Sequence, residues 1–105
     1  MIIFNITFNV EDDISREWLD YMQNELIPEM LKTKRVHSAV LSELLLDEPQ
    51  GTSYALQFKS DNAENLKKFK EEELPRIFTG ISTKYGDKVV FFPTEMKIIK
   101  HFDCH

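Results

Sequence analysis

Hydrophobic and polar residues alternate along the first ten positions, which is the pattern of a β-strand with one buried face. The apolar face would hold Ile2, Phe4, Ile6, Phe8 and Val10, and the mixed face Ile3, Asn5, Thr7 and Asn9. Residues 36–46 and 53–60 are rich in branched and aromatic side chains and predict two further strands. Residues 89–99 predict a fourth strand, with Val90, Phe92, Met96 and Ile98 on one face and Val89, Phe91, Glu95 and Ile99 on the other.

Two segments between these strands carry apolar residues at helical spacing, one around Trp18 and one around Phe69. Each contains a proline, "NELIPEML" at Pro28 and "EEELPRIF" at Pro75. Because proline lacks an N–H and disfavours helical geometry in the residue before it, we predict a break near Leu26–Ile27 and a short restart at Pro28. The second helix aligns with the first on its proline. We therefore interpret both breaks as architecture and not as a functional kink, and Trp18 as a core residue.

The predicted order is β-α-β-β-α-β, which favours one ferredoxin-like α+β domain over residues 1–105 with a flexible tail at 101–105. Right-handed crossovers would place both helices on one face of a four-stranded antiparallel sheet. The other face would then be open. On it we expect Asn5, Thr7, Gln57, Phe91 and Glu95, and, less clearly determined by the pattern, Leu41, Leu45 and His37 from the second strand.

An open face that mixes apolar side chains with amides suits a homodimer in which two sheets enclose a partly polar cavity. The net charge of -5 argues against nucleic acid and anionic membrane as partners. No apolar run approaches the roughly 20 residues that span a bilayer, and the start of the chain lacks a basic signal-peptide region. With one cysteine, Cys104, no internal disulfide can form, so we expect a soluble cytoplasmic protein.

Candidate chemistry in the sequence is sparse. The ending "KHFDCH" offers His101, Asp103, Cys104 and His105 as metal ligands, but a chain end is a poor scaffold and we predict adventitious binding only. The acidic "NVEDDIS" after the first strand would repel phosphate. We find no pattern typical of a catalytic triad or a phosphate loop, and we predict no cofactor, no structural metal and no catalytic residue.

The segments "WLDYMQNELIPEML", "YALQF" and "YGDKVVFFPTEMKII" resemble a family of small bacterial proteins that is known as a domain of unknown function. That family is similar to the dimeric α+β barrel group, which pairs sheet to sheet and includes cofactor-independent monooxygenases and haem-degrading enzymes. Trp18, Pro28, Asp87 and Glu95 match the family pattern, without an implied chemical role. Family members often carry histidine where this chain has Leu26, so an activity that depends on that histidine is not implied here.

The sequence thus favours a non-catalytic homodimeric module with a binding or regulatory role toward a small molecule or another protein. Asn5, Thr7, Gln57, Phe91 and Glu95 are the candidate ligand-binding residues. One alternative is a monooxygenase-like enzyme that uses the enclosed cavity, with the same polar groups orienting the substrate. Another is a structural subunit whose dimerisation is itself the function.

Overall fold

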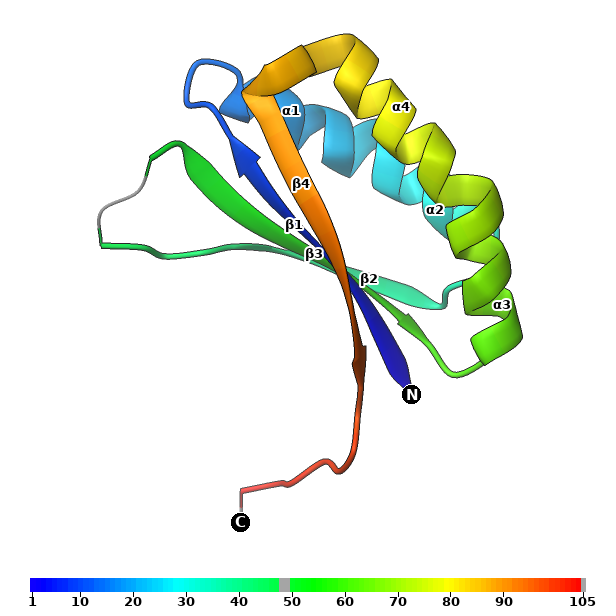
Figure 1. Cartoon of the computed structure of the whole chain (residues 1–105). Helices are drawn as coiled ribbons and strands as arrows, with labels where there is room; N and C mark the ends of the chain where they lie inside the picture. The colour runs from blue at the N-terminus through cyan, green and yellow to red at the C-terminus, as the bar shows by residue number, and fades with distance from the viewer. Residues whose placement is uncertain (48–49, 105) are drawn as a thin grey trace.

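The computed structural model describes residues 1–47 and 50–104, so Glu48, Pro49 and His105 lie outside the described residues. The strands are β1 (Ile2–Val10), β2 (Ser38–Glu43), β3 (Thr52–Ser60) and β4 (Val89–Lys97). They form an antiparallel sheet in the order β2-β3-β1-β4, with β2 and β4 at its edges (Figure 1). The ferredoxin-like order predicted from the sequence is confirmed.

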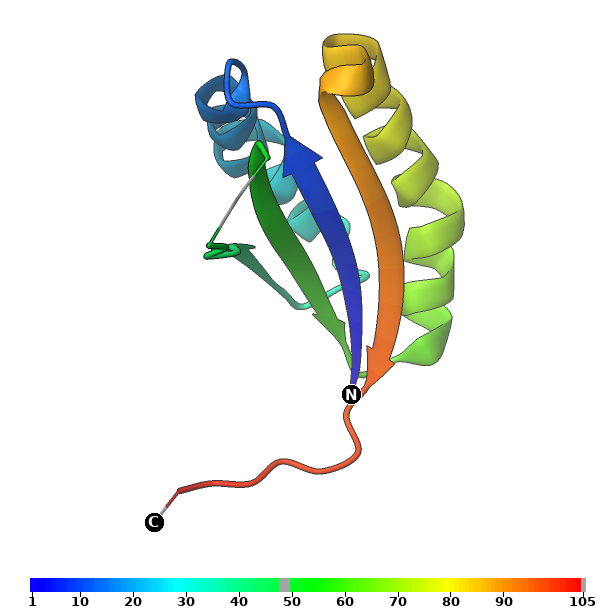
Figure 2. The ribbon, with the colours of Figure 1, turned by 60° about the vertical axis from the view of Figure 1, so that its left-hand side comes forward.

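Two long helices cover one face of the sheet (Figure 1; Figure 2). The first runs through α1 (Ser15–Tyr21), a π-helical turn η1 (Met22–Leu26) and α2 (Ile27–Lys32). The second runs through α3 (Ala63–Lys68), a π-helical turn η2 (Phe69–Glu73) and α4 (Leu74–Tyr85), and a short 3₁₀ turn η3 (Gly86–Lys88) leads into β4. The Asn62 side chain caps the second helix by accepting from the N–H of Asn65.

The predicted breaks at the prolines are wrong, because both helices continue through their prolines by way of the π-helical turns. Ile27 keeps helical dihedral angles, φ -63° and ψ -46°, and its N–H donates to the carbonyl of Met22, five residues back. Leu74 donates in the same way to Phe69. The π-helical turn displaces the backbone carbonyls that would accept hydrogen bonds just before each proline. The N–H that proline lacks therefore breaks no regular series of α-helical hydrogen bonds.

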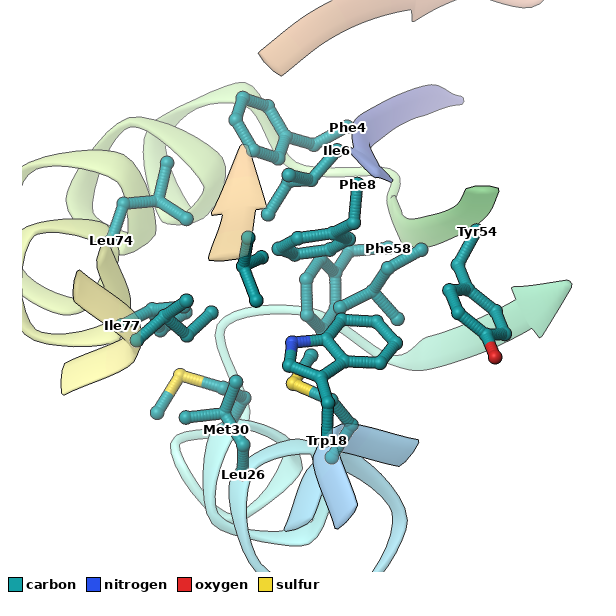
Figure 3. Packing of buried hydrophobic residues seen from close by; sticks show 14 of the residues in the cluster. Phe4, Ile6, Phe8, Trp18, Leu26, Met30, Tyr54, Phe58, Leu74 and Ile77 are labelled. Carbon is teal, nitrogen blue, oxygen red and sulfur yellow. The ribbon is translucent and has the colours of Figure 1, made fainter. Parts of the chain in front are cut away.

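The core lies between the sheet and the helices (Figure 3). Trp18 is fully buried, as predicted, and its ring lies 5.0 Å from that of Phe8 and 4.8 Å from that of Tyr54. The alternating residues of β1 and β3 supply the opposite wall, and their other side chains point away from the helices. The alternation predicted for β1 is therefore confirmed, and it leaves one sheet face without a helix over it.

The chain leaves the sheet at the end of β4. The N–H of Ile98 donates to the carbonyl of Met1 at 3.1 Å, which extends the pairing of β1 and β4 by one residue. The residues that follow run away from the body of the molecule without joining a strand or helix (Figure 1; Figure 2).

Candidate functional site

The sheet face that points away from the helices, called the open face below, carries fifteen strand residues whose positions follow from the pairing register. They are Ile3, Asn5, Thr7 and Asn9 of β1, Ser38, Val40 and Ser42 of β2, Ser53, Ala55, Gln57 and Lys59 of β3, and Val90, Phe92, Thr94 and Met96 of β4. Directly paired residues of adjacent strands share a face, so these side chains form rows across the sheet. The middle row is Val40, Gln57, Asn5 and Thr94.

Three of the five predicted ligand-binding residues lie together on this face. Asn5 of β1 is paired with Gln57 of β3, and Thr7 is the next residue of β1 on the same side. The Asn5 Nδ2 donates to Thr7 Oγ1 at 3.1 Å. The Oδ1 of Asn5 is shielded from solvent and accepts no hydrogen bond from the described residues, although buried acceptors are usually paired.

The other two predicted residues, Phe91 and Glu95, lie on the opposite face, which corrects the sequence assignment. The register pairs Phe91 with Phe8 and Glu95 with Phe4, both of which are buried under the helices. The Phe91 ring stacks on Phe78 of α4 at 4.4 Å between centroids. Glu95 accepts from the amino group of Lys70 in η2 at 2.8 Å. Phe92 and Thr94 take their places on the open face.

The second strand is also corrected, since its open-face residues are even-numbered. Leu41 is paired with the buried Leu56 and therefore faces the helices. His37 precedes β2, and its N–H donates to the carbonyl of Lys59. Leu45 follows β2 and is 89% exposed. Val40, paired with Gln57, is the large apolar residue that β2 contributes to the open face.

Apolar and polar groups are arranged on the open face in an unusual order. The edge strands carry large side chains with exposed apolar surface, namely Val40 of β2 and Val90, Phe92 and Met96 of β4, at 38–60% exposure. The amides lie on the central strands, where Asn5 and Gln57 are beside Thr7, and Ser38, Ser42 and Thr94 add hydroxyls on the edge strands. A typical interface has an apolar core and a polar rim, and the open face has the reverse arrangement. Margins that pack against a partner would here leave a polar cavity between the two surfaces.

Two hollows of the monomer lie at the ends of the sheet and not over its polar centre. One, of about 410 Å³, is lined by Asn9, Glu11, Asp12, Asp13, Gln50 and Gly51. The other, of about 470 Å³, is lined by Met1, Ile2, Asp61, Ala63, Glu95, Met96 and Lys97. Asn5, Thr7 and Gln57 line neither of these two hollows.

Groups with a shifted pKa lie away from the open face. A hydrogen bond from Lys88 lowers the pKa of the Asp13 carboxyl, and Asp13 in turn raises the pKa of Lys88. Burial raises the pKa of Tyr21 on the first helix. Burial, with nearby Glu17, raises the pKa of Tyr85 to about 12. These shifts arise at a loop pair and at the helices, and they mark no acid or base on the open face.

The chain end was the other candidate for ligand chemistry. In residues 1–47 and 50–104, no group of three or more His, Cys, Asp or Glu side chains is placed to hold a metal ion. His101 Nε2 lies 3.6 Å from Asp103 Oδ1, and Cys104 is an exposed free thiol. His105, the fourth predicted ligand, lies outside the described residues.

A family model described as "Domain of unknown function (DUF4286)" matches residues 1–99 of the chain. The chain belongs to this family. The resemblance noted in the sequence is thereby confirmed. A search of curated proteins finds no match to this DUF4286 member.

Solved structures similar to this DUF4286 protein share its fold at low sequence identity. A dimeric ferredoxin-like protein from an uncultured marine organism has a TM-score of 0.69 at 13% identity and covers 98% of each chain. An ethyl tert-butyl ether d (ethd) family protein from Bacillus halodurans C-125 has a TM-score of 0.67 at 11% identity and covers 94% of this chain and 100% of that one. A protein from Deinococcus radiodurans that is described as a putative antibiotic biosynthesis monooxygenase has a TM-score of 0.64 at 15% identity and covers 100% of this chain and 99% of that one.

At these identities the similarity establishes the ferredoxin-like fold alone. None of the helices in the described part of the chain has the length and apolar character needed to span a bilayer. The function therefore has to be inferred from the open face itself.

Proposed function

We propose that this DUF4286 protein is a homodimer that pairs through its open faces and binds a small molecule in the partly polar cavity between them, without catalysing a reaction. The observation that carries the proposal is the polar centre of the open face between apolar edge strands. Burying Val40, Phe92 and Met96 against a second copy would remove their apolar surface from water. A structural neighbour described as dimeric supports a homodimer.

The ligand would meet amide and hydroxyl groups at the centre of the cavity. Asn5, Thr7 and Gln57, joined by Thr94, present donors and acceptors within one region of the sheet. The unpaired Oδ1 of Asn5 supports a ligand with a hydrogen-bond donor, because that pairing would offset the cost of a shielded acceptor. Phe92, which is paired with Thr7, supplies an apolar wall beside these polar residues.

A non-catalytic role is preferred over the monooxygenase-like alternative because of the chemistry available on this face. General acid–base catalysis needs a titratable group within reach of the substrate. Among the strand residues of the open face, all of which the structure describes, Lys59 is the one titratable side chain, at one end of β3. Amides, hydroxyls and apolar groups can orient and enclose a molecule, which is sufficient for a binding or regulatory module.

Native mass spectrometry of the protein purified from its own host tests this proposal. We expect a dimer that carries an added small mass. The variant Gln57→Leu should lose that mass and remain a dimer, and the matched variant Gln23→Leu, at an exposed position of the first helix, should keep it. A monomer would overturn the assembly. A dimer that binds nothing, or that keeps the added mass in Gln57→Leu, would overturn the ligand site and leave dimerisation as the function.

A further inference from the structure

Two segments outside the sheet expose large apolar side chains to solvent. The leucine segment, Leu44–Leu46, follows β2, and its Leu45 is 89% exposed. The C-terminal segment, residues 98–104, follows β4, and its Ile99 and Phe102 are 94% and 77% exposed. Isolated exposed apolar residues are ordinary, but two clusters at this exposure in a chain of 105 residues indicate surfaces that are covered in the assembled protein.

The two segments lie at diagonally opposite corners of the sheet. β2 and β4 are the two edge strands. Glu43, the last residue of β2, pairs with Tyr54, which pairs with Phe8 near the end of β1. Lys97, the last residue of β4, pairs with Ile2 at the start of β1. The leucine segment and the C-terminal segment therefore leave the sheet at opposite edges and opposite ends.

This separation prevents the two segments of one molecule from covering each other. The nine residues of β1 span about 30 Å at the usual strand rise. Seven residues of a fully extended tail reach about 23 Å, and they start at the far corner pointing away from the sheet. Figure 1 and Figure 2 show the C-terminal segment running away from the strands. The leucine segment and the C-terminal segment of one molecule therefore cannot cover each other, and a second molecule can cover both.

A second copy of this chain supplies that surface by symmetry. When two sheets face each other with their strands crossing at nearly a right angle, as packed sheets often do, the two-fold axis runs along a diagonal of the sheet. Of the two diagonals, we take the one that joins the other two corners of the sheet, because rotation about it exchanges the corner of the leucine segment with the corner of the C-terminal segment. The C-terminal segment of one copy then meets the leucine segment of the other, and the reciprocal contact forms at the same time, as a two-fold interface requires.

We infer that the C-terminal segment of each protomer reaches across the dimer and packs Ile99 and Phe102 against Leu44–Leu46 of the second copy. The inference rests on the proposed face-to-face homodimer and specifies its geometry. It also gives the exposed outer edge of β2 a neighbour, since an extended chain beside an edge strand can pair with its free N–H and C=O groups. The contact would close two margins of the cavity between the sheets.

Disulfide trapping tests the contact directly. In a Cys104→Ser background, the double variant Ile99→Cys with Leu45→Cys is oxidised and run on a non-reducing gel. We expect a covalent dimer. The matched pair Ile99→Cys with Ser82→Cys, which moves the second thiol to an exposed position on α4, should stay monomeric on the gel, as should each single variant. Equal trapping in the two pairs, or trapping in neither, overturns the inference.

Truncation after Lys97 provides a second measurement that leaves the core intact. Sedimentation equilibrium should show the dissociation constant of the dimer raised at least about tenfold, since buried aromatic anchors dominate interface energies. An unchanged constant overturns the inference. If truncation leaves the dissociation constant unchanged while Phe92→Ala weakens the dimer, the face-to-face dimer stands and the tail contact alone fails. If the full chain is a monomer at all concentrations, the proposed homodimer and the tail contact fail together.

Discussion

Two adjacent phenylalanines of β4 provide the sharpest test of the register and of the proposed dimer. Phe91 lies under the helices and stacks on Phe78, whereas Phe92 lies on the open face at 60% exposure. The same substitution to alanine should therefore have opposite consequences at the two positions. Phe91→Ala should lower the free energy of unfolding of the monomer, and Phe92→Ala should weaken the dimer.

The magnitudes follow from the burial of each ring. A phenylalanine side chain has about 200 Å² of surface, so the exposed 60% of Phe92 amounts to about 120 Å². Complete burial of that area is worth up to about 3 kcal/mol for each copy at ~25 cal/mol/Å². Allowing for side-chain ordering, Phe92→Ala should cost at least about 2 kcal/mol of association, a roughly 30-fold rise in the dissociation constant. Its effect on the monomer should stay below about 0.5 kcal/mol.

Phe91→Ala has the reverse expectation. The half-buried ring packs on Phe78 and lies 6.1 Å from Phe8, so its removal leaves a gap in the core that should cost about 2 kcal/mol of unfolding free energy. Urea unfolding, performed at concentrations below the dissociation constant of the dimer, separates this loss from dimerisation. Sedimentation equilibrium measures the dimer. A dimer that is unaffected by Phe92→Ala would refute the interface, and a larger unfolding loss for Phe92→Ala than for Phe91→Ala would refute the register.

Further predictions concern four single positions outside the open face. Because the pKa of Tyr85 is raised to about 12, its contribution to stability is present below pH 10 and lost as the pH rises toward 12; Tyr85→Phe should remove that loss in alkaline unfolding experiments. Gly51→Ala should destabilise by roughly 2 kcal/mol or more, because φ is +72° and a Cβ would lie 2.6 Å from the carbonyl oxygen of Val10. Gly80→Ala, inside α4 with ordinary space around its Cβ, should instead stabilise by about 0.5–1 kcal/mol, and thermal melts of the two glycine variants measure both changes. Pro28→Ala should destabilise by less than about 1 kcal/mol in urea, and the gain of about 3 kcal/mol expected at a regular helix interior would contradict the role of the π-helical turn.

The order of elements and the buried face of β1 could be predicted because the local pattern of apolar and polar residues is compatible with one arrangement only. In β1, apolar and polar residues alternate over most of the strand, and a shift by one residue would place Asn5 and Thr7 in the core. Trp18 lies on the apolar stripe of the first helix, and no polar residue interrupts that stripe. These positions are decided by burial alone, which a sequence pattern reports directly.

The faces of β4 and β2 could not be predicted, because both of their sides are apolar. "VVFF" at the start of β4 places the same residue type on each face, so periodicity cannot distinguish Phe91 from Phe92. The choice is made by the chain entering β4, where η3 brings Val89 beside the buried Val10. In β2, Leu41 and Val40 are similarly equivalent in sequence. Candidate site residues taken from these strands therefore depended on tertiary register, and two of the five were misplaced.

The π-helical turns, by contrast, left a signal in the sequence that a search for regular helices passes over. In an α-helix each residue advances 100°, so two residues five apart lie about 140° away from one another on the helix surface. Met22 and Ile27 are five apart, as are Phe69 and Leu74, and all four pack in or against the core. A single π-helical turn between the members of each pair restores them to one face, and in both helices the proline follows at the next residue. Apolar residues five apart, with proline directly after the second, thus indicate a widened turn. Because this pattern occurs in both helices, the two βαβ halves of the fold share the same local structure before their prolines.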